Sequence, residues 1–229
     1  EMGHALPTFN RNFSMTEDLI PEFRKQHQNK GLYRSAYGYY DIANLKTSPL
    51  IADFYMDFDS KADIELARED IKLVIWQMHQ DLTYGLPIEA FRIYFSGMKG
   101  FHLIIPREYL GIKAHPQLDN LFKWIALGFF EQSFNETVDL VVYERRRLFR
   151  LENSQHQKTG LYKIPLQYHE LLNLSLEEIH ELAKQPRQLI NYPKPELIQK
   201  ANKMYLKEAK AYVDYEKEQA ERFKNYKNV

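Results

Sequence analysis

The sequence contains no cysteine among its 229 residues. This absence excludes a disulfide framework, a zinc ribbon and catalysis by a thiol. The sequence also lacks any run of about 18 apolar residues, the length that a membrane-spanning helix needs, and it lacks the layout of a signal peptide. We therefore expect a soluble, cytoplasmic protein that has no membrane partner.

An excess of charge of one sign is also missing, because 31 Lys and Arg residues balance 31 Asp and Glu residues. A neutral chain does not coat nucleic acid indiscriminately, although it can carry local charged patches. Apolar residues make up 44% of the chain and charged residues 27%, as is typical of a globular protein. A chain of this length can bury a substantial core without disulfides or structural metals.

Hydrophobic periodicity predicts an α+β (α/β-type) fold. Residues 51–59 alternate between apolar and polar side chains, which is the pattern of a strand. Apolar residues then recur at helical spacing as far as Leu82. We expect this helix to start at Ser60, with Asp63 completing a capping-box-like signal, and to end at Gly85.

The rest of the chain continues this mixed pattern. Residues 91–95 and 101–105 read as two strands around a glycine-containing turn, so that strand, helix and strand follow one another as in a crossover connection. Further apolar patterns predict a helix over 118–134 and a short strand over 138–142. Ser175 and the Glu three residues later predict the start of another helix.

The pattern suggests three parts. We expect residues 1–50 to form the N-terminal part of a core, residues 51–190 to form the core itself, and residues 191–229 to form a charged helical tail. This tail could lead to an accessory domain outside the sequence.

Asp57 and Asp59 stand two residues apart on the first predicted strand, so both carboxylates point to one face, about 6–7 Å apart along it. Carboxylate oxygens are the ligands that hard divalent cations prefer. A strand that simply exposes one polar face to solvent would show the same pair. The two aspartates therefore need further support before they indicate a metal site.

The turn between the next two strands, SGMKGFH over residues 96–102, combines flexibility with positive charge. Gly97 and Gly100 allow a tight turn and a close approach of the backbone, while Ser96, Lys99 and His102 could contact a triphosphate. A basic hairpin whose histidine bonds to a local carbonyl is the alternative interpretation.

A third carboxylate, Asp139, precedes a basic segment. Residues 144–163 contain six Lys and Arg residues against two Glu, in a chain with no net charge. Arginine forks are suited to bidentate contacts with phosphate. The alternative is a carboxylate at a strand end beside a solvated basic loop.

The three segments FYMDFD (54–59), FSGMKGFH (95–102) and VDLVVYERRRLFRLENSQHQKTGLYKIPL (138–166) resemble, in this order, the three motifs of the archaeo-eukaryotic primase superfamily. That family includes the catalytic primase subunit, primase-polymerases and the polymerase domain of bacterial ligase D. The resemblance extends over residues 51–166, about half of the chain, and its most specific element is the S-G-x-K-G-x-H turn.

The resemblance implies a primase-polymerase catalytic core with an RRM-like sheet that carries the acidic triad, and a smaller N-terminal α/β lobe. It implies template-directed nucleotidyl transfer with NTP or dNTP on a single-stranded DNA template and primer. Asp57, Asp59 and Asp139 would be catalytic and would hold two Mg²⁺ or Mn²⁺ ions. The residues that it assigns to nucleotide binding are Ser96, Lys99, His102, Arg147, Arg150, His156, Lys158 and Arg34.

The chain also departs from parts of this family. It has no cysteine for the zinc-binding insertion of cellular primases, which favours a compact bacterial, plasmid or phage type. Its tail is too short for a helicase or a full helical priming domain, so such a module would lie outside this sequence or on a partner chain. A ligase D-like repair polymerase, a two-metal nuclease or phosphatase, and a non-catalytic module that binds single strands or nucleotides remain alternatives.

Overall fold

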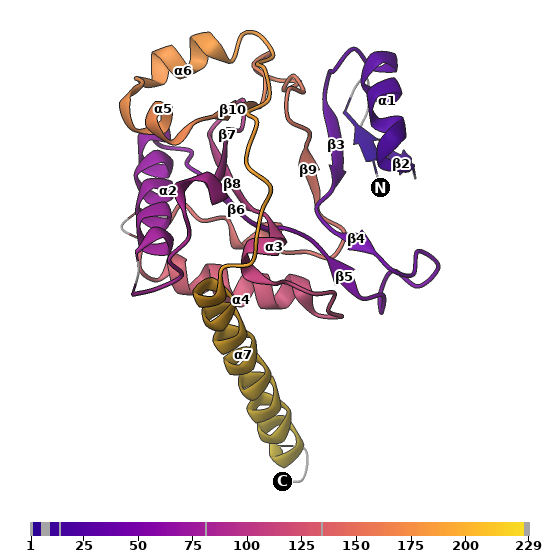
Figure 1. Ribbon diagram of the computed structural model, residues 1–229. Coiled ribbons are helices and arrows are strands. Elements are labelled where there is room, and N and C mark those ends of the chain that lie inside the picture. Colours follow the sequence, from indigo (N-terminus) through magenta and orange to yellow (C-terminus); the bar gives the residue numbers. More distant parts are fainter. Residues whose placement is uncertain (1, 6–9, 14, 81, 134, 227–229) are drawn as a thin grey trace.

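The computed structural model describes residues 2–5, 10–13, 15–80, 82–133 and 135–226. Within these residues the protein has an α+β fold, which confirms the fold class expected from the sequence. Two four-stranded antiparallel sheets face each other, and helices cover the outer side of the sheet that contains β6, β7, β8 and β10 (Figure 1).

The central sheet joins its strands in the order β10, β7, β8 and β6, and every neighbouring pair is antiparallel. The strands are β6 (Phe54–Asp59), β7 (Arg92–Phe95), β8 (Gly100–Ile105) and β10 (Ile164–Leu166). Since β6 and β7 both pair with β8, they run parallel to each other. Helix α2 (Ile64–His79) connects them, which confirms the crossover expected from the sequence.

Helix α2 differs from its predicted bounds at both ends. It begins after Asp63, whose carboxylate accepts a hydrogen bond from the backbone N–H of Glu65 at 2.9 Å. The predicted start at Ser60 is wrong, because its hydroxyl oxygen instead accepts a bond from Asp63 N in the preceding turn. The helix ends at His79, because the next residue, Gln80, has an extended backbone conformation. Leu82 therefore lies beyond the helix and is 96% exposed.

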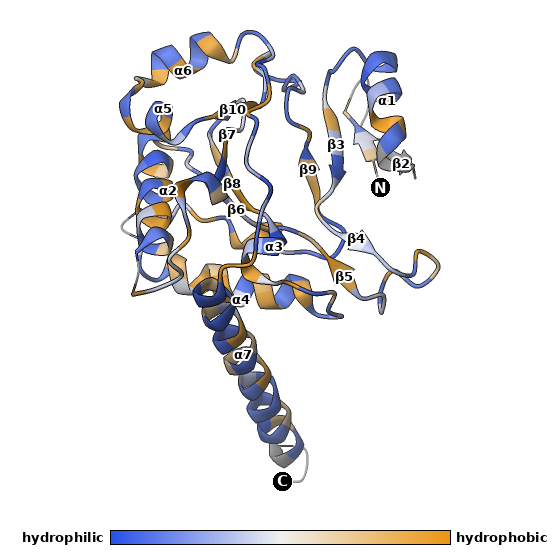
Figure 2. Cartoon of the chain, viewed as in Figure 1, coloured by the Kyte–Doolittle hydropathy of each residue, from blue (hydrophilic) through white to orange (hydrophobic). Residues whose placement is uncertain are grey.

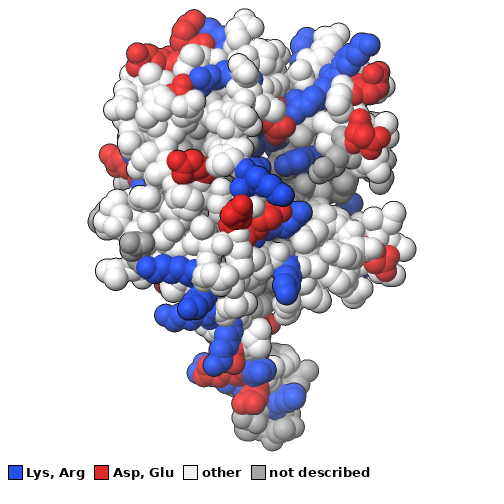
Figure 3. Space-filling model, viewed as in Figure 1, with Lys and Arg blue, Asp and Glu red and all other residues white. Residues whose placement is uncertain are grey.

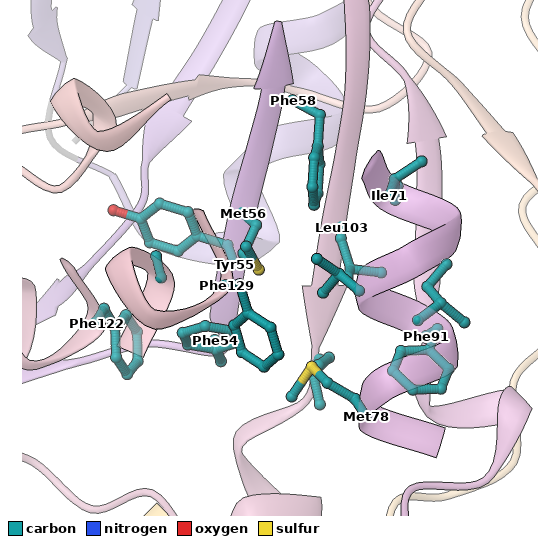
Figure 4. Packing of buried hydrophobic residues seen from close by; sticks show 14 of the residues in the cluster. Phe54, Tyr55, Met56, Phe58, Ile71, Met78, Phe91, Leu103, Phe122 and Phe129 are labelled. Atoms are coloured by element: carbon teal, nitrogen blue, oxygen red, sulfur yellow. The ribbon is translucent and has the colours of Figure 1, made fainter. Parts of the chain in front are cut away.

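The apolar face of β6 supplies the centre of the core. Phe54, Met56 and Phe58 are at most 1% exposed. They lie among side chains of α2 and α4 (Leu118–Phe130), as Figure 4 shows. Burying a side chain of this size contributes about 1.5–3 kcal/mol, so these contacts fix which face of β6 turns inward. The opposite face, with Asp57 and Asp59, turns toward the second sheet.

The chain around Asp139 lies along the free edge of β6. One antiparallel bridge joins Phe58 to Val138, and the backbone N–H of Asp139 donates to Asp57 O at 2.8 Å. With this bridge included, the order across the central sheet is residue 138, β6, β8, β7 and β10.

The strand predicted over 138–142 is wrong beyond this bridge. Residues Leu140–Val142 instead form a 3₁₀ turn, η3, which begins at Asp139. The Asp139 carboxylate accepts a bond from Val141 N at 2.9 Å and thereby turns the backbone away from the sheet edge. The hydrogen bond to the Asp139 side chain therefore favours a 3₁₀ turn over the strand that the short apolar run predicts.

The second sheet, here called the N-terminal sheet, has the strand order β2, β1, β3 and β9. Its strands are β1 (Met2–His4), β2 (Asn10–Phe13), β3 (Leu32–Ser35) and β9 (Leu148–Arg150). Because β9 follows Asp139 in the chain, residues 1–50 do not form this sheet alone. The outer face of the sheet carries η1 (Glu17–Leu19) and α1 (Ile20–Gln26).

Short elements complete the body of the protein. They are β4 (Gly38–Tyr39), β5 (Leu50–Ile51), η2 (Ile88–Ala90), α3 (Arg107–Leu110), α5 (Tyr168–Asn173) and α6 (Leu176–Leu182). A capping box between Ser175 and Glu178 starts α6, as the sequence predicts.

The last helix, α7 (Gln199–Tyr226), extends away from the body (Figure 1). Ala201, Tyr205 and Tyr212 are buried against the body, whereas the far half is largely hydrophilic (Figure 2). The C-terminal segment from Gln199 to Tyr226 is thus one long helix with a hydrophilic far half. None of the helices in the described ranges combines the length and the apolar character needed to cross a bilayer.

Candidate metal centre

Three carboxylates that are far apart in the sequence meet at one end of β6. One oxygen each from Asp57, Asp59 and Asp139 lies within 4.8 Å of the other two. Asp57 is 6% exposed, and the other two are half-buried. The alternation of β6 brings Asp57 and Asp59 to one face, and the bridge along its edge brings Asp139 beside them.

Helix α2 holds the segment that precedes Asp139. The buried carboxylate of Asp70 accepts two bonds from Thr137, one from its backbone N–H at 3.0 Å and one from its hydroxyl at 2.8 Å. The backbone N–H of Asp59 donates to Thr137 O at 2.8 Å. Asp70 therefore positions the third carboxylate without belonging to the cluster, and nothing in the local sequence indicates this role.

The cluster is electrostatically unfavourable without a cation. Burial, followed by the charges of Asp59 and Asp139, raises the pKa of Asp57 to about 8. The nearby Arg147 and Lys163 lower it in part. Asp57 therefore binds a proton far more readily than an exposed aspartate does, unless another positive charge replaces that proton.

The arrangement is suitable for a hard metal ion. The three ligands are carboxylate oxygens, and Asp57 Oδ1 is buried without a hydrogen-bond partner among the described residues. A carboxylate oxygen that accepts no hydrogen bond inside a protein needs a compensating interaction. Mg²⁺, Mn²⁺ and Ca²⁺ all prefer oxygen ligands of this kind.

A pocket of about 140 Å³ opens beside the cluster, and we call it the acidic pocket. Eight of the residues singled out in the sequence line it, namely Asp57, Asp59, Ser96, Lys99, His102, Arg147, Arg150 and His156. The pocket therefore combines two of the carboxylates with residues from the β7–β8 turn, from β9 and from the loop that follows β9.

Two glycines allow the β7–β8 turn to lie against the carboxylates. Gly100 pairs with Asp59 across β8 and β6, and a Cβ atom at Gly100 would lie 1.7 Å from Phe58 O. Gly97 has a φ of +85°, in the region that favours glycine. Thr159 Oγ1 donates to Gly97 O at 2.6 Å and ties this turn to the loop after β9.

Two side chains of this turn contact the aspartates directly. Lys99 Nζ lies 2.7 Å from Asp59 Oδ2, and His102 Nε2 lies 3.5 Å from Asp57 Oδ1. Burial lowers the pKa of His102 well below its usual value, and the charges of Lys163, Arg150 and Arg147 lower it further. Both effects favour the neutral imidazole. His102 Nδ1 is buried without a hydrogen-bond partner among the described residues, so the expected alternative, a bond to a local carbonyl, is not formed by this atom.

The basic side of the pocket comes from the end of the N-terminal sheet. Arg150 donates to the hydroxyl of Tyr33 at 2.8 Å, and its guanidinium lies 4.8 Å from the centre of that ring. Arg147 Nε is buried without a hydrogen-bond partner among the described residues. Phe149, between the two arginines, packs edge-on against His102 at 5.0 Å. Strand β9 and the residue just before it therefore present two cations to the carboxylates.

Two of the proposed nucleotide contacts do not line this pocket. Lys158 is exposed in the loop after β9, where its backbone N–H donates to His156 Nδ1 at 3.1 Å. Arg34, on β3, lines a separate cavity at the other end of the cleft between the sheets.

Sequence reasoning did not assign a role to Lys163, which is 2% exposed. Its Nζ donates to Arg150 O at 3.0 Å and lies 5.8 Å from the centre of the Phe149 ring. In the sequence, Lys163 is only one of the six Lys and Arg residues of the basic segment 144–163, and nothing distinguishes it from the others. Tyr33 and Phe149 were equally hard to find, because only the pairing of β3 with β9 brings them to the pocket.

Comparisons of the chain with protein-family models and with curated proteins give no match. The interpretation of the site therefore depends on its own geometry and on the resemblance of the three segments.

Proposed function

We propose that this protein is a metal-dependent nucleotidyltransferase that copies single-stranded DNA, a primase-polymerase of the family that the three segments resemble. The observation that carries the proposal is a cluster of three carboxylates beside a pocket that Lys99, His102, Arg147 and Arg150 also line. A solvated strand face would not require this combination of charges.

The order of the strands also supports the proposal. From β6 to the bridge at Val138, the chain follows strand, helix, strand, strand, helix and bridge, and the bridge returns beside the first strand. This is the split βαβ connectivity of an RRM-like sheet. It is the fold that the resemblance implies for the part of the chain that carries the aspartates.

In the proposed reaction, Asp57, Asp59 and Asp139 hold two divalent cations, Mg²⁺ or Mn²⁺. When bound, such ions would lower the pKa of the attacking 3′-hydroxyl. They would also neutralise negative charge at the α-phosphate and on the leaving pyrophosphate. The buried Asp57 and the two half-buried aspartates fix where this charge lies.

The positive side chains of the acidic pocket bind and orient the triphosphate. Lys99 and Arg147 are suited to this role, because Lys99 already lies against Asp59 and Arg147 Nε has no partner within the described part of the chain. Neutral His102 can donate one hydrogen bond to a phosphate oxygen without adding charge. Arg150, held by Tyr33, presents a guanidinium of fixed orientation.

The experiment is synthesis on a single-stranded template, with and without a primer, with labelled rNTP or dNTP in Mg²⁺ or Mn²⁺. We expect template-dependent products, which the Asp57→Ala/Asp59→Ala variant does not make. Products without a primer would assign a primase, and products only with one would assign an extending polymerase, including the ligase D-like type.

Other outcomes would overturn the proposal. Shortening of the substrate without added nucleotide would indicate a nuclease. Metal-independent binding of single strands that weakens with salt, without any synthesis by folded protein, would indicate a binding module. Asp214→Asn, an exposed aspartate on α7, serves as the matched control and should synthesise as the wild type does.

A further inference from the structure

A second and larger cavity lies at the opposite end of the cleft between the two sheets. It has a volume of about 380 Å³, and we call it the basic cavity. Residues from both sheets line it, among them Arg34 of β3, Arg92 and Tyr94 of β7, and Lys163. Cavities of a few hundred Å³ are of the size that hold small ligands.

The charge of the basic cavity is unbalanced. Its lining contains five cations, Arg34, Arg92, Arg107, Arg150 and Lys163, and two carboxylates, Asp53 and Glu152. In Figure 3, Lys and Arg side chains gather beside the hollow between the N-terminal lobe, at the upper right, and the rest of the molecule. A concave surface lined by one sign of charge attracts ligands of the opposite sign.

Both carboxylates already have partners. Glu152 pairs with Arg24, with 2.9 Å between Oε1 and Nη2, and Arg24 does not line the cavity. Asp53 Oδ1 accepts the backbone N–H of Arg107 at 3.0 Å. The partner of Asp53 is a neutral amide, and Arg107 Nε also lies 3.3 Å from Glu108 Oε1, so carboxylates compensate part of the positive charge. The lining nevertheless keeps an excess of cations.

Two of the cations have features that favour an anionic ligand. Arg92 Nε is buried and has no hydrogen-bond partner within the described residues. Lys163 is 2% exposed, and its one hydrogen bond to a described residue goes to a backbone carbonyl, that of Arg150. A bound anion would give Arg92 Nε an acceptor, and it would add to the partial compensation that Lys163 receives from Glu152 and Asp57.

The cavity also has an aromatic wall. Tyr94 is half-buried, and Lys163 Nζ lies 4.7 Å from the centre of its ring. A tyrosine ring beside cations can stack on a base while the cations hold a phosphate. Inorganic anions would use only the cations, so the ring favours a ligand that carries both groups.

We propose that the basic cavity binds a free nucleotide, with its phosphate near Arg92 and Arg107 and its base against Tyr94. This site is separate from the acidic pocket and needs none of the three aspartates. Arg150 and Phe149 line both spaces, so a nucleotide in the basic cavity would touch two residues of the acidic pocket. The proposal does not depend on the polymerase activity proposed above.

The six methionines of the chain provide a direct test. Met2 and Met15 line the basic cavity, Met98 lines the acidic pocket, and Met56 and Met78 lie in the core. We would label the methionine methyl groups with ¹³C and titrate the full chain with AMP, in EDTA, by NMR. The expected result is a saturable shift of the Met2 and Met15 signals, while the Met98 signal moves less.

The matched variant is Arg92→Gln/Arg107→Gln, which should weaken AMP binding at least about tenfold, because charge-assisted contacts with the phosphate are lost. Unchanged core signals from Met56 and Met78 would show that the variant is folded. If it does not fold, Arg107→Gln alone replaces it, since that side chain is 44% exposed. Arg222→Gln, on the exposed part of α7, is the control and should bind AMP as the wild type does.

Several outcomes would overturn the proposal. These are no saturable shift of Met2 or Met15, a shift of Met98 alone, or unchanged AMP binding by the folded arginine variant. Inorganic phosphate that binds as tightly as AMP would reduce the site to a simple anion site. Binding of a short oligothymidylate without binding of AMP would indicate a nucleic-acid strand in the cavity instead. Loss of polymerase activity would leave the AMP result unchanged, so the two proposals fail independently.

Discussion

The acidic pocket and the basic cavity occupy the two ends of one cleft, yet their electrostatics are opposite. At one end, burial and two neighbouring carboxylates raise the pKa of Asp57 to about 8. At the other, burial lowers the pKa of Lys163 to about 7. Both shifts favour the neutral form of the side chain, which is the usual effect of removing a charge from water.

The two ends of the cleft therefore favour ligands of opposite charge. At the acidic end three clustered carboxylates lie beside Lys99, Arg147 and Arg150, and the cluster favours a bound cation. At the basic end five Lys and Arg residues face two carboxylates, which favours a bound anion. Phe149 and Arg150 of β9 separate the two ends and line both. Strand β9 is thus the element through which the two sites could influence each other.

The largest effect should come from removing a carboxylate at the acidic end. We expect Asp139→Asn to lower template-directed synthesis by about 1,000-fold or more, because charge stabilisation in the transition state is lost. Primer extension measures this, and circular dichroism checks the fold. Synthesis within a fewfold of the wild type would exclude Asp139 from the site.

The next largest effect should come from filling the space between Gly100 on β8 and the backbone of Phe58 on β6. Gly100→Ala would place a Cβ atom 1.7 Å from Phe58 O, so we expect a loss of about 3 kcal/mol or more in the free energy of unfolding. Gly128→Ala is the matched control, since a Cβ there meets nothing within 4 Å. Because Gly128 lies inside α4, this change should stabilise the protein by about 0.5–1 kcal/mol. Urea unfolding measures both values, and equal effects would contradict the β6–β8 register.

A pH series tests the cost of the buried charge. The pKa of Asp57 is about 8 in the folded protein, against an ordinary value of 3.8. The folded state therefore holds this proton more tightly than the unfolded chain does. The free energy of unfolding should fall as the pH rises from 3.8 to about 8, because folding then requires the carboxyl group to be buried without its proton. In EDTA, Asp57→Asn should exceed the wild type in unfolding free energy by about 1–3 kcal/mol at high pH. At acid pH the two proteins should have nearly equal unfolding free energies. A difference that does not vary with pH would contradict the raised pKa of Asp57.

The smallest effect should come from the ion pair at the mouth of the acidic pocket. Lys99→Ala removes a cation 2.7 Å from Asp59, and we expect it to raise the KM for nucleotide about tenfold with a smaller change in kcat. Lys61→Ala, at an exposed position just after β6, is the control. Steady-state kinetics separates the two parameters, and a loss confined to kcat would assign Lys99 a different role.

Local patterns in the sequence were enough to predict β6, α2 and the β7–β8 turn. Period-2 alternation placed Asp57 and Asp59 on one face, and two glycines indicated a tight turn beside them. These features depend on neighbours in the chain, so composition and spacing can identify them.

Features that depend on distant parts of the chain could not be predicted in this way. The apolar run after Asp139 resembled a strand, but the hydrogen bond that Val141 N donates to the Asp139 carboxylate made it a 3₁₀ turn. The pairing of β3 with β9 brings Tyr33 beside Arg150 and leaves Arg34 in the basic cavity. No local signal showed this pairing, and none indicated that Asp70 supports Thr137.

The central claim is that Asp57, Asp59 and Asp139 form a divalent-cation site, and Mn²⁺ tests it most directly. Mn²⁺ is paramagnetic and broadens the NMR signals of nearby methyl groups. In ¹³C-methionine-labelled protein, we predict that it broadens Met98, which lines the acidic pocket, before Met204 on α7. The selective effect should disappear in Asp57→Asn/Asp139→Asn and persist in Asp214→Asn. Broadening that is equal at all methionines, or unchanged in the double variant, would contradict the claim.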